Sequence, residues 1–529
     1  MLLNNRMNLQ AQKLQPQLYV GHFFIWWLIP IFKFLKLQRV RRQLPPGPIP
    51  LPVFGTLIQL NFQFNRDLLM KLAKIHGNIF TLWFGWAPVI VLNGFQAVKD
   101  GMTTHPEDVS GRLVSPFFRA MAKGKGIMLA TGHTWKQQRR FALRTLRDLG
   151  LGKRGLEHRV QEEAHYLVAF FASMKGKPMD PSFSLVHSVS NVICAVVYGH
   201  RFSREDETFH DLIRATEHLF KFGGSFIHHT EDEPRSTYNE DNMVCSINDL
   251  FLGGSETTST TLNWGLLYMV ANPDIQEKVQ KELDAVLGPS QLICYEDRRE
   301  LPYTNAVVHE VQRFSNIISV GMPRVCVRNT TLLSFALKKG TIVLPNIASS
   351  LYDPEHWETP RQFNPGHFLD KDGNFVSREA FLPFSIGHRV CLGEHLARTE
   401  LFIFFANLLR AFTFRLPEGV TKISTEPILG GKNPTRNVWQ QDISGGSQQG
   451  DGRGTLGTRR GNLVKVASQL FVSGVAHVSR CDRSTTAAWC CPTCVQHPHL
   501  NLHSSTKPKT AEELTGMGCK SDDTYCFLW

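Results

Sequence analysis

A single cysteine between two glycines most restricts what this chain can fold into: Cys391, in FLPFSIGHRVCLGEH (residues 381–395). An apolar segment precedes it and a helical pattern follows it. A thiolate ligand must be deprotonated and held on a stiff turn, and the positive end of a following helix favours its charge. Gly387 and Gly393 permit tight turns and close backbone approach. A lone cysteine is more often a small buried hydrophobe, but this spacing favours a metal ligand.

Two further residues of this stretch fit a flat macrocycle such as haem. Phe384 can cover the outer side of the sulfur, and Arg389 can reach a propionate. A thiolate axial ligand pushes electron density onto the iron and favours O–O cleavage. The run F-S-I-G-H-R-V-C-L-G resembles the cytochrome P450 haem signature F-x-x-G-x-R-x-C-x-G. The resemblance implies a mostly α fold with small β-sheets, binding haem b through Cys391 as the axial iron ligand.

The motif EVQR places Glu310 and Arg313 on one face of a predicted helix, where they can pair. Taken alone, such a motif is usually a surface ion pair. In the P450 pattern it forms a buried structural network with a later segment, which here resembles FNPGHF. The resemblance assigns His367 the third position of that network.

The motif GGSETT, residues 253–258, lies inside a long helical run, although glycine and threonine are poor helix formers. One interpretation is a simple break in the helix. The resemblance instead implies a local distortion that opens a groove where oxygen binds. Thr257 would then supply an alcohol and Glu256 would feed a proton relay.

Four more residues match the family's contacts to the haem propionates. Trp135 and Arg139, in WKQQR, resemble W-x-x-x-R, in which both side chains reach a propionate. Arg112 in SGR and Arg324 in MPR match two further contacts. Arginine suits this role because it offers permanently charged donors in a fixed geometry.

The N-terminal part of the chain predicts a membrane anchor. Residues 18–37 are mostly apolar and a basic flank follows them. They could form a signal-anchor with the basic flank cytosolic, an interfacial helix, or an imperfect start to the chain. We favour membrane attachment. The proline-rich segment 44–55 is predicted to be stiff and extended, and would hold the following domain at a fixed angle.

We expect three regions: an anchor with its basic flank (1–43), a haem domain (44–430), and an atypical, disordered tail (431–529). Within the haem domain, the sequence predicts four long helices, a hairpin and a further strand, at residues 155–173, 241–271, 302–315, 394–411, 80–94 and 339–350. The scattered cysteines indicate an intracellular protein with reduced thiols. Cysteines and histidines at 490–499 only weakly resemble a zinc site.

The P450 resemblance covers residues 44–429 and looks most like microsomal family 2, in particular the J subfamily. Residues 221–241 depart from the family, which has two long helices there that roof the substrate pocket. Several tens of residues are missing by comparison. The family's final pocket strands also have no counterpart in the tail.

The leading hypothesis is a haem-thiolate monooxygenase anchored to the endoplasmic reticulum membrane, with its catalytic domain in the cytosol. It would insert one oxygen atom from O₂ into lipophilic substrates such as arachidonate and other polyunsaturated fatty acids, or xenobiotics. The resemblance implies NADPH as electron source, through NADPH–cytochrome P450 reductase, with cytochrome b5 as a further partner. A basic proximal side that includes Arg389 and His388 suits such acidic partners.

The net charge of +12 favours anionic surfaces. Membrane lipid and acidic proteins fit the anchor and the motifs, so no nucleic-acid partner is expected. The alternative is a haem-binding or membrane-tethered non-enzyme, impaired because the pocket roof is truncated.

Overall fold

The computed structural model describes residues 32–61, 65–114, 119, 122–150, 154–222, 239–288 and 291–417. The chain divides into two units, Met1–Gln448 and Gln449–Trp529, and every described residue belongs to the first. The predicted anchor lies outside the described residues up to position 31, as do the tail and most of 221–241. Within the described ranges, no helix combines the length and the apolar character that crossing a bilayer requires.

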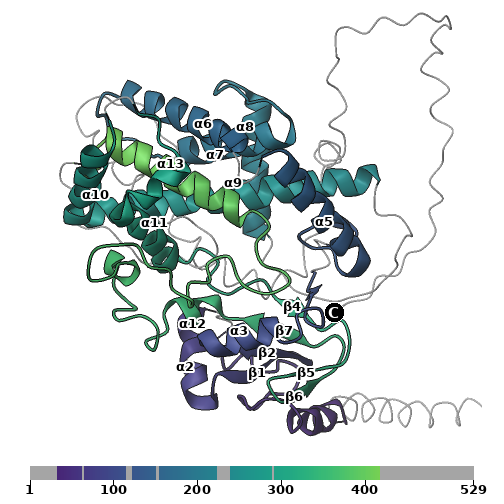
Figure 1. Ribbon diagram of the computed structural model, residues 1–529. Helices are drawn as coiled ribbons and strands as arrows, with labels where there is room; N and C mark the ends of the chain where they lie inside the picture. Colours follow the sequence, from purple (N-terminus) through teal and green to yellow (C-terminus); the bar gives the residue numbers. More distant parts are fainter. Residues whose placement is uncertain are drawn as a thin grey trace, which may run out of the picture. The chain divides into compact units, whose positions relative to one another are not determined.

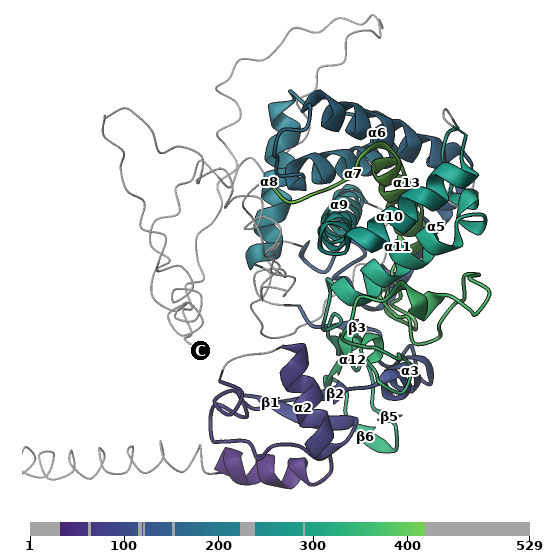
Figure 2. The same ribbon diagram turned by 90° about the vertical axis from the view of Figure 1, so that its left-hand side faces the viewer.

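A long helix, α9 (Glu240–Ala271), runs through the helical part of the molecule. Figure 2 shows it nearly end-on with other helices around it. Asn239 caps its N-terminus by accepting from the N–H of Asn242, and its second half is almost entirely buried. The helices packed against it are α7 (Ser182–Val197), α8 (Glu207–Phe222), α10 (Pro273–Val286), α11 (Pro302–Ser315) and α13 (Glu394–Ala411).

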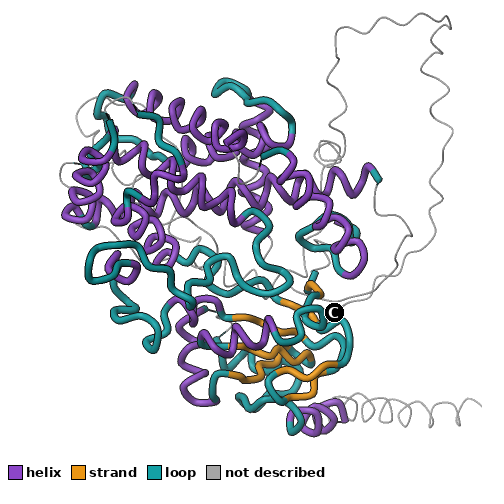
Figure 3. The backbone as a smooth tube through the Cα atoms, in the orientation of Figure 1, coloured by secondary structure: helices purple, strands orange, loops and turns teal. Residues whose placement is uncertain are grey.

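A five-stranded sheet forms the second part, below the helices in Figure 3. The strand order is β1 (Ile79–Phe84), β2 (Ala87–Leu92), β7 (Ile342–Pro345), β4 (Arg324–Val325) and β3 (Gly111–Arg112). The pairing of β3 with β4 sets Arg112 directly opposite Arg324. Two cations in that register repel each other unless an anion lies between them.

The remaining elements lie between and around these two parts (Figure 1). They are α2 (Arg66–His76), α3 (Phe95–Thr103), α5 (Gly132–Asp148), α6 (Arg154–Ser173), α12 (Ile347–Leu351), η1 (Tyr295–Arg299), η2 (Pro365–Phe368), a two-stranded sheet of β5 (Thr330–Leu332) and β6 (Phe335–Leu337), and a helical segment at 32–41.

The four predicted helices are confirmed, with ends within one residue of those predicted, and so is the hairpin. The strand predicted over 339–350 is wrong in length. It ends at Pro345, which has no N–H to extend the ladder, and α12 follows. The broken helix at GGSETT is also wrong, because α9 is continuous through residues 253–258. Packing on several sides outweighs the weak helix propensity there.

Candidate functional site

The cysteine loop, residues 384–393, joins the sheet region to α13. The N–H of Cys391 donates to the carbonyl of Phe384 at 3.0 Å, which closes the loop. Gly387 has φ +82°, and a Cβ there would lie 2.2 Å from the carbonyl oxygen of Met102, so glycine is required. Gly393 has φ −95°, which any residue can adopt. The expectation that both glycines serve tight turns is therefore corrected. A Cβ at Gly393 would meet no atom within 4 Å, so the loop is open on that side.

The thiol of Cys391 lies at the N-terminal end of α13, where the N–H of Gly393 donates to the sulfur. The residue as a whole is exposed. Partial desolvation by the surrounding protein nevertheless raises the pKa of Cys391, with a further increase from Glu394. Gly393 and Arg139 act in the opposite direction. A bound metal ion reverses this balance, because a coordinating thiol loses its proton.

Four arginines converge around the cysteine loop, on the side that leads to β3 and β4. Arg139 of α5 donates to the carbonyl of Val390 at 2.7 Å. Arg112 donates to the carbonyl of Met128 at 3.1 Å, and Arg324 donates to that of Arg389 at 3.3 Å. Two of the cations that the sequence assigned to the propionates, Arg139 and Arg324, thus hold the loop that carries the cysteine.

Arg389 is buried and points away from solvent. Its guanidinium donates to the carbonyls of Ser110 (2.8 Å), Ile127 (3.3 Å) and Ala130 (2.6 Å). It also stands 3.9 Å from the ring centre of Trp135, which is itself buried. The expectation that Arg389 belongs to a basic outer surface is therefore wrong. A conformation that satisfies three carbonyls fixes its side chain inside the protein.

The four arginines repel one another, and a bound anion would neutralise their charge. Burial and mutual repulsion lower the pKa of Arg389 to about 7 and that of Arg112 to about 10, and they also lower the pKa of Arg324 well below its usual value. Among the residues that the structure describes, no carboxylate forms a salt bridge with any of the four. Nε and Nη1 of Arg324 are buried without a hydrogen-bond partner.

A ligand with two carboxylates beside a metal ion would satisfy this arrangement. Haem has that chemistry, since its propionates can neutralise the arginines while the thiolate of Cys391 binds its iron. The open side of Gly393 leaves room for the close approach of a flat ring. The residues present therefore fit haem.

The helix α9 carries the predicted acid–alcohol pair, Glu256 and Thr257, both half-buried. The hydroxyl of Thr257 donates to the carbonyl of Gly253 at 2.7 Å. The hydroxyls of Ser259 and Thr261 also donate to the backbone carbonyl four residues earlier in the helix. Such contacts bend a helix without breaking it, which is how α9 accommodates these polar residues.

Two carboxylates near these elements, one buried and one half-buried, were missed by sequence reasoning. Glu400 of α13 accepts from the hydroxyl of Thr258 at 3.2 Å, and burial raises the pKa of Glu400 to about 8. Asp249 of α9 accepts from the N–H groups of Ile127 (2.6 Å) and Met128 (2.8 Å), and burial raises its pKa to about 6. Neither lies in a motif, so only their burial in the fold identifies them.

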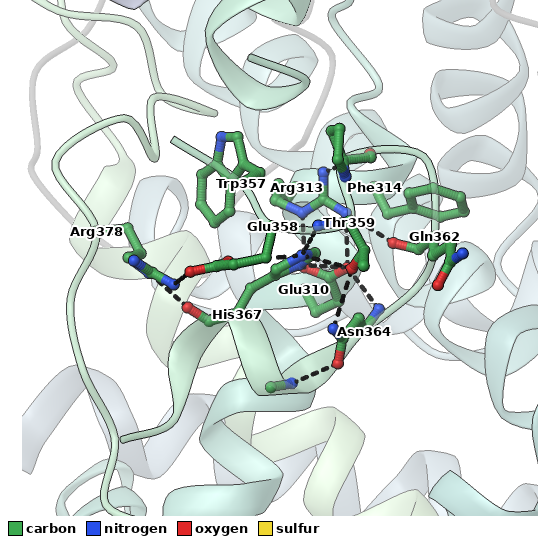
Figure 4. Close-up of polar contacts among 12 residues, drawn as sticks. Glu310, Arg313, Phe314, Trp357, Glu358, Thr359, Gln362, Asn364, His367 and Arg378 are labelled. Atoms are coloured by element: carbon green, nitrogen blue, oxygen red, sulfur yellow. Dashed lines mark hydrogen bonds and ion pairs between the residues drawn. The ribbon is translucent and has the colours of Figure 1, made fainter. Parts of the chain in front are cut away.

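The structure brings Glu310, Arg313 and His367 together in a fully buried network (Figure 4). Nε and Nη2 of Arg313 donate to the two carboxylate oxygens of Glu310, each at 2.7 Å. Nδ1 of His367 lies 3.2 Å from Glu310, and the N–H of Asn364 donates to the same carboxylate at 2.8 Å. The carbonyls of Leu351, Pro360 and Gln362 accept the other guanidinium protons at 2.8–2.9 Å. The network ties α11 to the segment 351–367, which leads to the cysteine loop.

The outer face of α5 is strongly basic and hollowed. Lys136, Arg140, Arg144 and Arg147 are exposed on it. A concave site of about 550 Å³ lies over this face, and His388 of the cysteine loop lines it as well. An acidic surface that docks here would therefore reach the backbone next to the thiolate.

Comparison with known proteins agrees with this geometry. The sequence profile of the Cytochrome P450 family matches residues 45–230 and 222–438. Cytochrome P450 2K1 of Oncorhynchus mykiss is 40% identical over 448 residues, covering 73% of this chain and 89% of that protein. Cytochrome P450 2J2 of Homo sapiens is 38% identical over 443 residues (73% and 88%), and Cytochrome P450 2C8 of Homo sapiens 36% over 460 residues (76% and 94%).

These comparisons support family 2 and agree with the J subfamily. The alignment with Cytochrome P450 2K1 is 448 positions long, but the 73% of this 529-residue chain that it covers amounts to fewer residues than that. Cytochrome P450 2K1 therefore has several tens of residues with no counterpart in this chain. The family match is divided at residues 222–230, inside the segment that the sequence indicated to be short.

Proposed function

Because the chain belongs to the cytochrome P450 family, whose members are haem-thiolate monooxygenases, we propose that this protein inserts one oxygen atom from O₂ into lipophilic substrates. The family uses haem b and takes electrons from NADPH through a reductase. The observation that supports the proposal is the group of four arginines beside Cys391, with no carboxylate paired to it in the described residues: Arg324 and Arg389 are buried, and Arg112 and Arg139 are half-buried. Bound haem would supply the oxygen activation.

The residues of this chain would hold haem and control its surroundings. Cys391 would ligate the iron and the N–H of Gly393 would moderate the charge on its sulfur. Arg112 and Arg324, opposite each other on β3 and β4, would bind propionate, together with Arg139 and Arg389.

We further propose that Thr257 and Glu256 move protons on the α9 side. The Thr257 hydroxyl can exchange its Gly253 partner for a bound water or substrate oxygen, because the intrahelical contact is not part of the backbone ladder. A half-buried carboxylate one residue earlier can renew the proton from solvent.

The direct test is the carbon monoxide difference spectrum of the reduced protein. The expressed protein should show the red-shifted band of thiolate-ligated haem, and Cys391→Ser should lose it. Cys294→Ser is the matched control, because Cys294 immediately precedes η1 and its hydrogen bonds are with Gln161, Leu292 and Asp297, away from the cysteine loop. An unchanged band in Cys391→Ser would disprove the assignment.

For substrates, we propose polyunsaturated fatty acids such as arachidonate, and lipophilic xenobiotics. The similarity to the J subfamily supports this choice. Incubation with reductase, NADPH and arachidonate, followed by product analysis, tests it. Absence of NADPH-dependent products with a normal carbon monoxide band would exclude arachidonate while keeping the enzyme class.

We propose that the exposed basic face of α5 receives NADPH–cytochrome P450 reductase, and also cytochrome b5, since it is hollowed and adjoins His388. The double variant Arg140→Gln/Arg144→Gln should slow reduction at low salt and leave the thiolate band intact. Lys278→Gln, an exposed cation of α10, is the control. Equal reduction rates in the three proteins would exclude this face.

We propose the endoplasmic reticulum membrane as the location, with the domain cytosolic and residues 18–37 contacting lipid. The basic residues that follow this apolar segment support that orientation. Alkaline extraction of microsomes and protease protection test attachment and orientation separately.

A further inference from the structure

His309 lies on α11, next to Glu310, with its ring among three phenylalanines. The ring centre is 5.5 Å from that of Phe368, 4.6 Å from Phe375 and 5.2 Å from Phe381. The residue is half-buried. Burial, with a contribution from Arg398, lowers the pKa of His309 to about 3, so the imidazole is neutral at physiological pH.

The two contacts of the ring fix its tautomer. Nδ1 lies 2.8 Å from the carbonyl oxygen of Asn305, which can only accept, so Nδ1 carries the proton. Nε2 lies 3.0 Å from Nη1 of Arg398, which can only donate. His309 therefore presents a lone pair to the guanidinium of Arg398.

Arg398 connects this imidazole to the start of α13. Its Nε and Nη2 donate to the same carboxylate oxygen of Glu394, at 3.1 and 3.0 Å. The guanidinium also stands 5.0 Å from the ring centre of Phe384, whose carbonyl accepts from the N–H of Cys391. One cation thus contacts the first residue of the cysteine loop, Phe384, and the residue that follows the loop, Glu394.

Glu394 is the first residue of α13 and follows Cys391 by three positions, so its carboxylate charge acts on the sulfur at short range. The field at the sulfur depends on how completely Arg398 offsets that carboxylate. The Arg398 side chain is 23% exposed, so it could turn towards water if the acceptor at His309 were lost. An acceptor fixed in the protein interior opposes that movement.

We propose that His309 is a positioning residue for the thiolate: by accepting from Arg398, it keeps the guanidinium on Glu394 and sets the negative potential at Cys391. The inference rests on the proposed haem-thiolate function. Groups that do not touch a metal tune it through its ligands, and the charge around an axial thiolate is one such control. Loss of the acceptor should leave the charge of Glu394 less compensated, which favours ferric over ferrous iron.

The test compares His309→Phe, which keeps an aromatic ring but has no acceptor, with His309→Gln, whose amide oxygen can still accept from Arg398. The readouts are the ferric/ferrous reduction potential of the haem-loaded protein and its haem content. His309→Phe should shift the reduction potential to more negative values. His309→Gln, which keeps an acceptor, should have a potential close to that of the wild type. Glu394→Gln, which removes the carboxylate charge, should shift it in the opposite direction.

A double-mutant cycle tests whether His309 acts through Arg398. Adding His309→Phe to Arg398→Gln should produce no further shift beyond that of Arg398→Gln alone. If His309→Phe fails to fold, Arg398→Gln and Arg398→Lys test whether the guanidinium that His309 holds sets the reduction potential. Replacing Arg398 leaves the phenylalanines around His309 in place.

Three results would overturn the inference. They are an unchanged reduction potential in His309→Phe with normal haem content, a shift in His309→Gln as large as that in His309→Phe, or additive shifts in the double-mutant cycle. Lower thermal stability with an unmoved potential would show that His309 only fills space among the phenylalanines. A wild-type protein without a thiolate spectrum would instead refute the proposed function on which the inference rests.

Discussion

Replacing Glu310 by alanine removes the acceptor at the centre of the buried network that ties α11 to the segment before the cysteine loop. Arg313 would lose both of its 2.7 Å contacts to the carboxylate and would keep only three backbone carbonyls as partners. The N–H of Asn364 and the ring of His367 would also lose their acceptor. The variant therefore contains an uncompensated buried cation and at least one unsatisfied donor.

The magnitude follows from these losses. Breaking a buried ion pair by removing one partner costs about 3–5 kcal/mol. Leaving the Asn364 N–H unsatisfied adds about 1–3 kcal/mol. The sum is a large part of the roughly 5–15 kcal/mol that stabilises a typical domain. We expect Glu310→Ala to be mostly unfolded, or to retain little haem. Glu310→Gln, which still offers one acceptor oxygen, should be intermediate.

The chain contains its own control, because Glu296 and Arg299 form a second E-x-x-R pair, with 61% and 72% of the side chains exposed. Glu296→Ala removes the same type of contact at a surface, where ion pairs contribute little. Urea midpoints and haem-to-protein ratios of the three variants would be compared with those of the wild type. If Glu310→Ala lost no more stability than Glu296→Ala, the reasoning from burial would be refuted.

Four further predictions concern other parts of the site. Thr257→Ala should keep its haem but release hydrogen peroxide at the expense of product; full coupling between NADPH use and product would exclude the proposed role of Thr257. Arg324→Met should release haem faster yet make the haem-free protein more stable, because it relieves repulsion within the arginine group; a less stable haem-free protein would contradict this. The pKa of Glu400 is raised to about 8 from 4.5, so its carboxyl favours the folded state at low pH and loses that contribution as pH rises towards 8. Glu400→Gln cannot ionise and should gain stability relative to wild type between pH 5 and 8, by at most about 1.4 kcal/mol per unit, whereas parallel urea midpoints across that range would refute the assignment. Replacing residues 221–241 by the longer segment of Cytochrome P450 2J2 should raise haem occupancy and coupling, and no change would show that the short segment suffices.

Long helices could be predicted from the sequence because each carries its own periodicity and end signals. Pro302 and Pro273 mark helix starts, and the apolar stripe after Glu394 is continuous. The cysteine loop could be predicted because its chemistry requires particular residue types at fixed spacing. These features are local in the chain, so tertiary context changes them little.

Pairing between short strands was not predictable. Strands β3 and β4 have two residues each, far too few for a pattern, yet their register places Arg112 opposite Arg324. The burial of Arg389 depends on carbonyls of residues 110–130, more than 250 positions earlier in the chain. The roles of Asp249 and His309 likewise depend on partners that only the fold brings close.

The arginine group beside Cys391 would make the amount of this protein in a cell depend on the haem supply. A ligand that binds only the folded chain stabilises it by RT ln(1 + [L]/Kd), so each tenfold rise in free haem above the dissociation constant adds about 1.4 kcal/mol. Without haem, the mutual repulsion of four cations opposes folding, and the chain is exposed to proteases and chaperones. Haem biosynthesis would then set the steady-state abundance of the protein, in addition to supplying its cofactor.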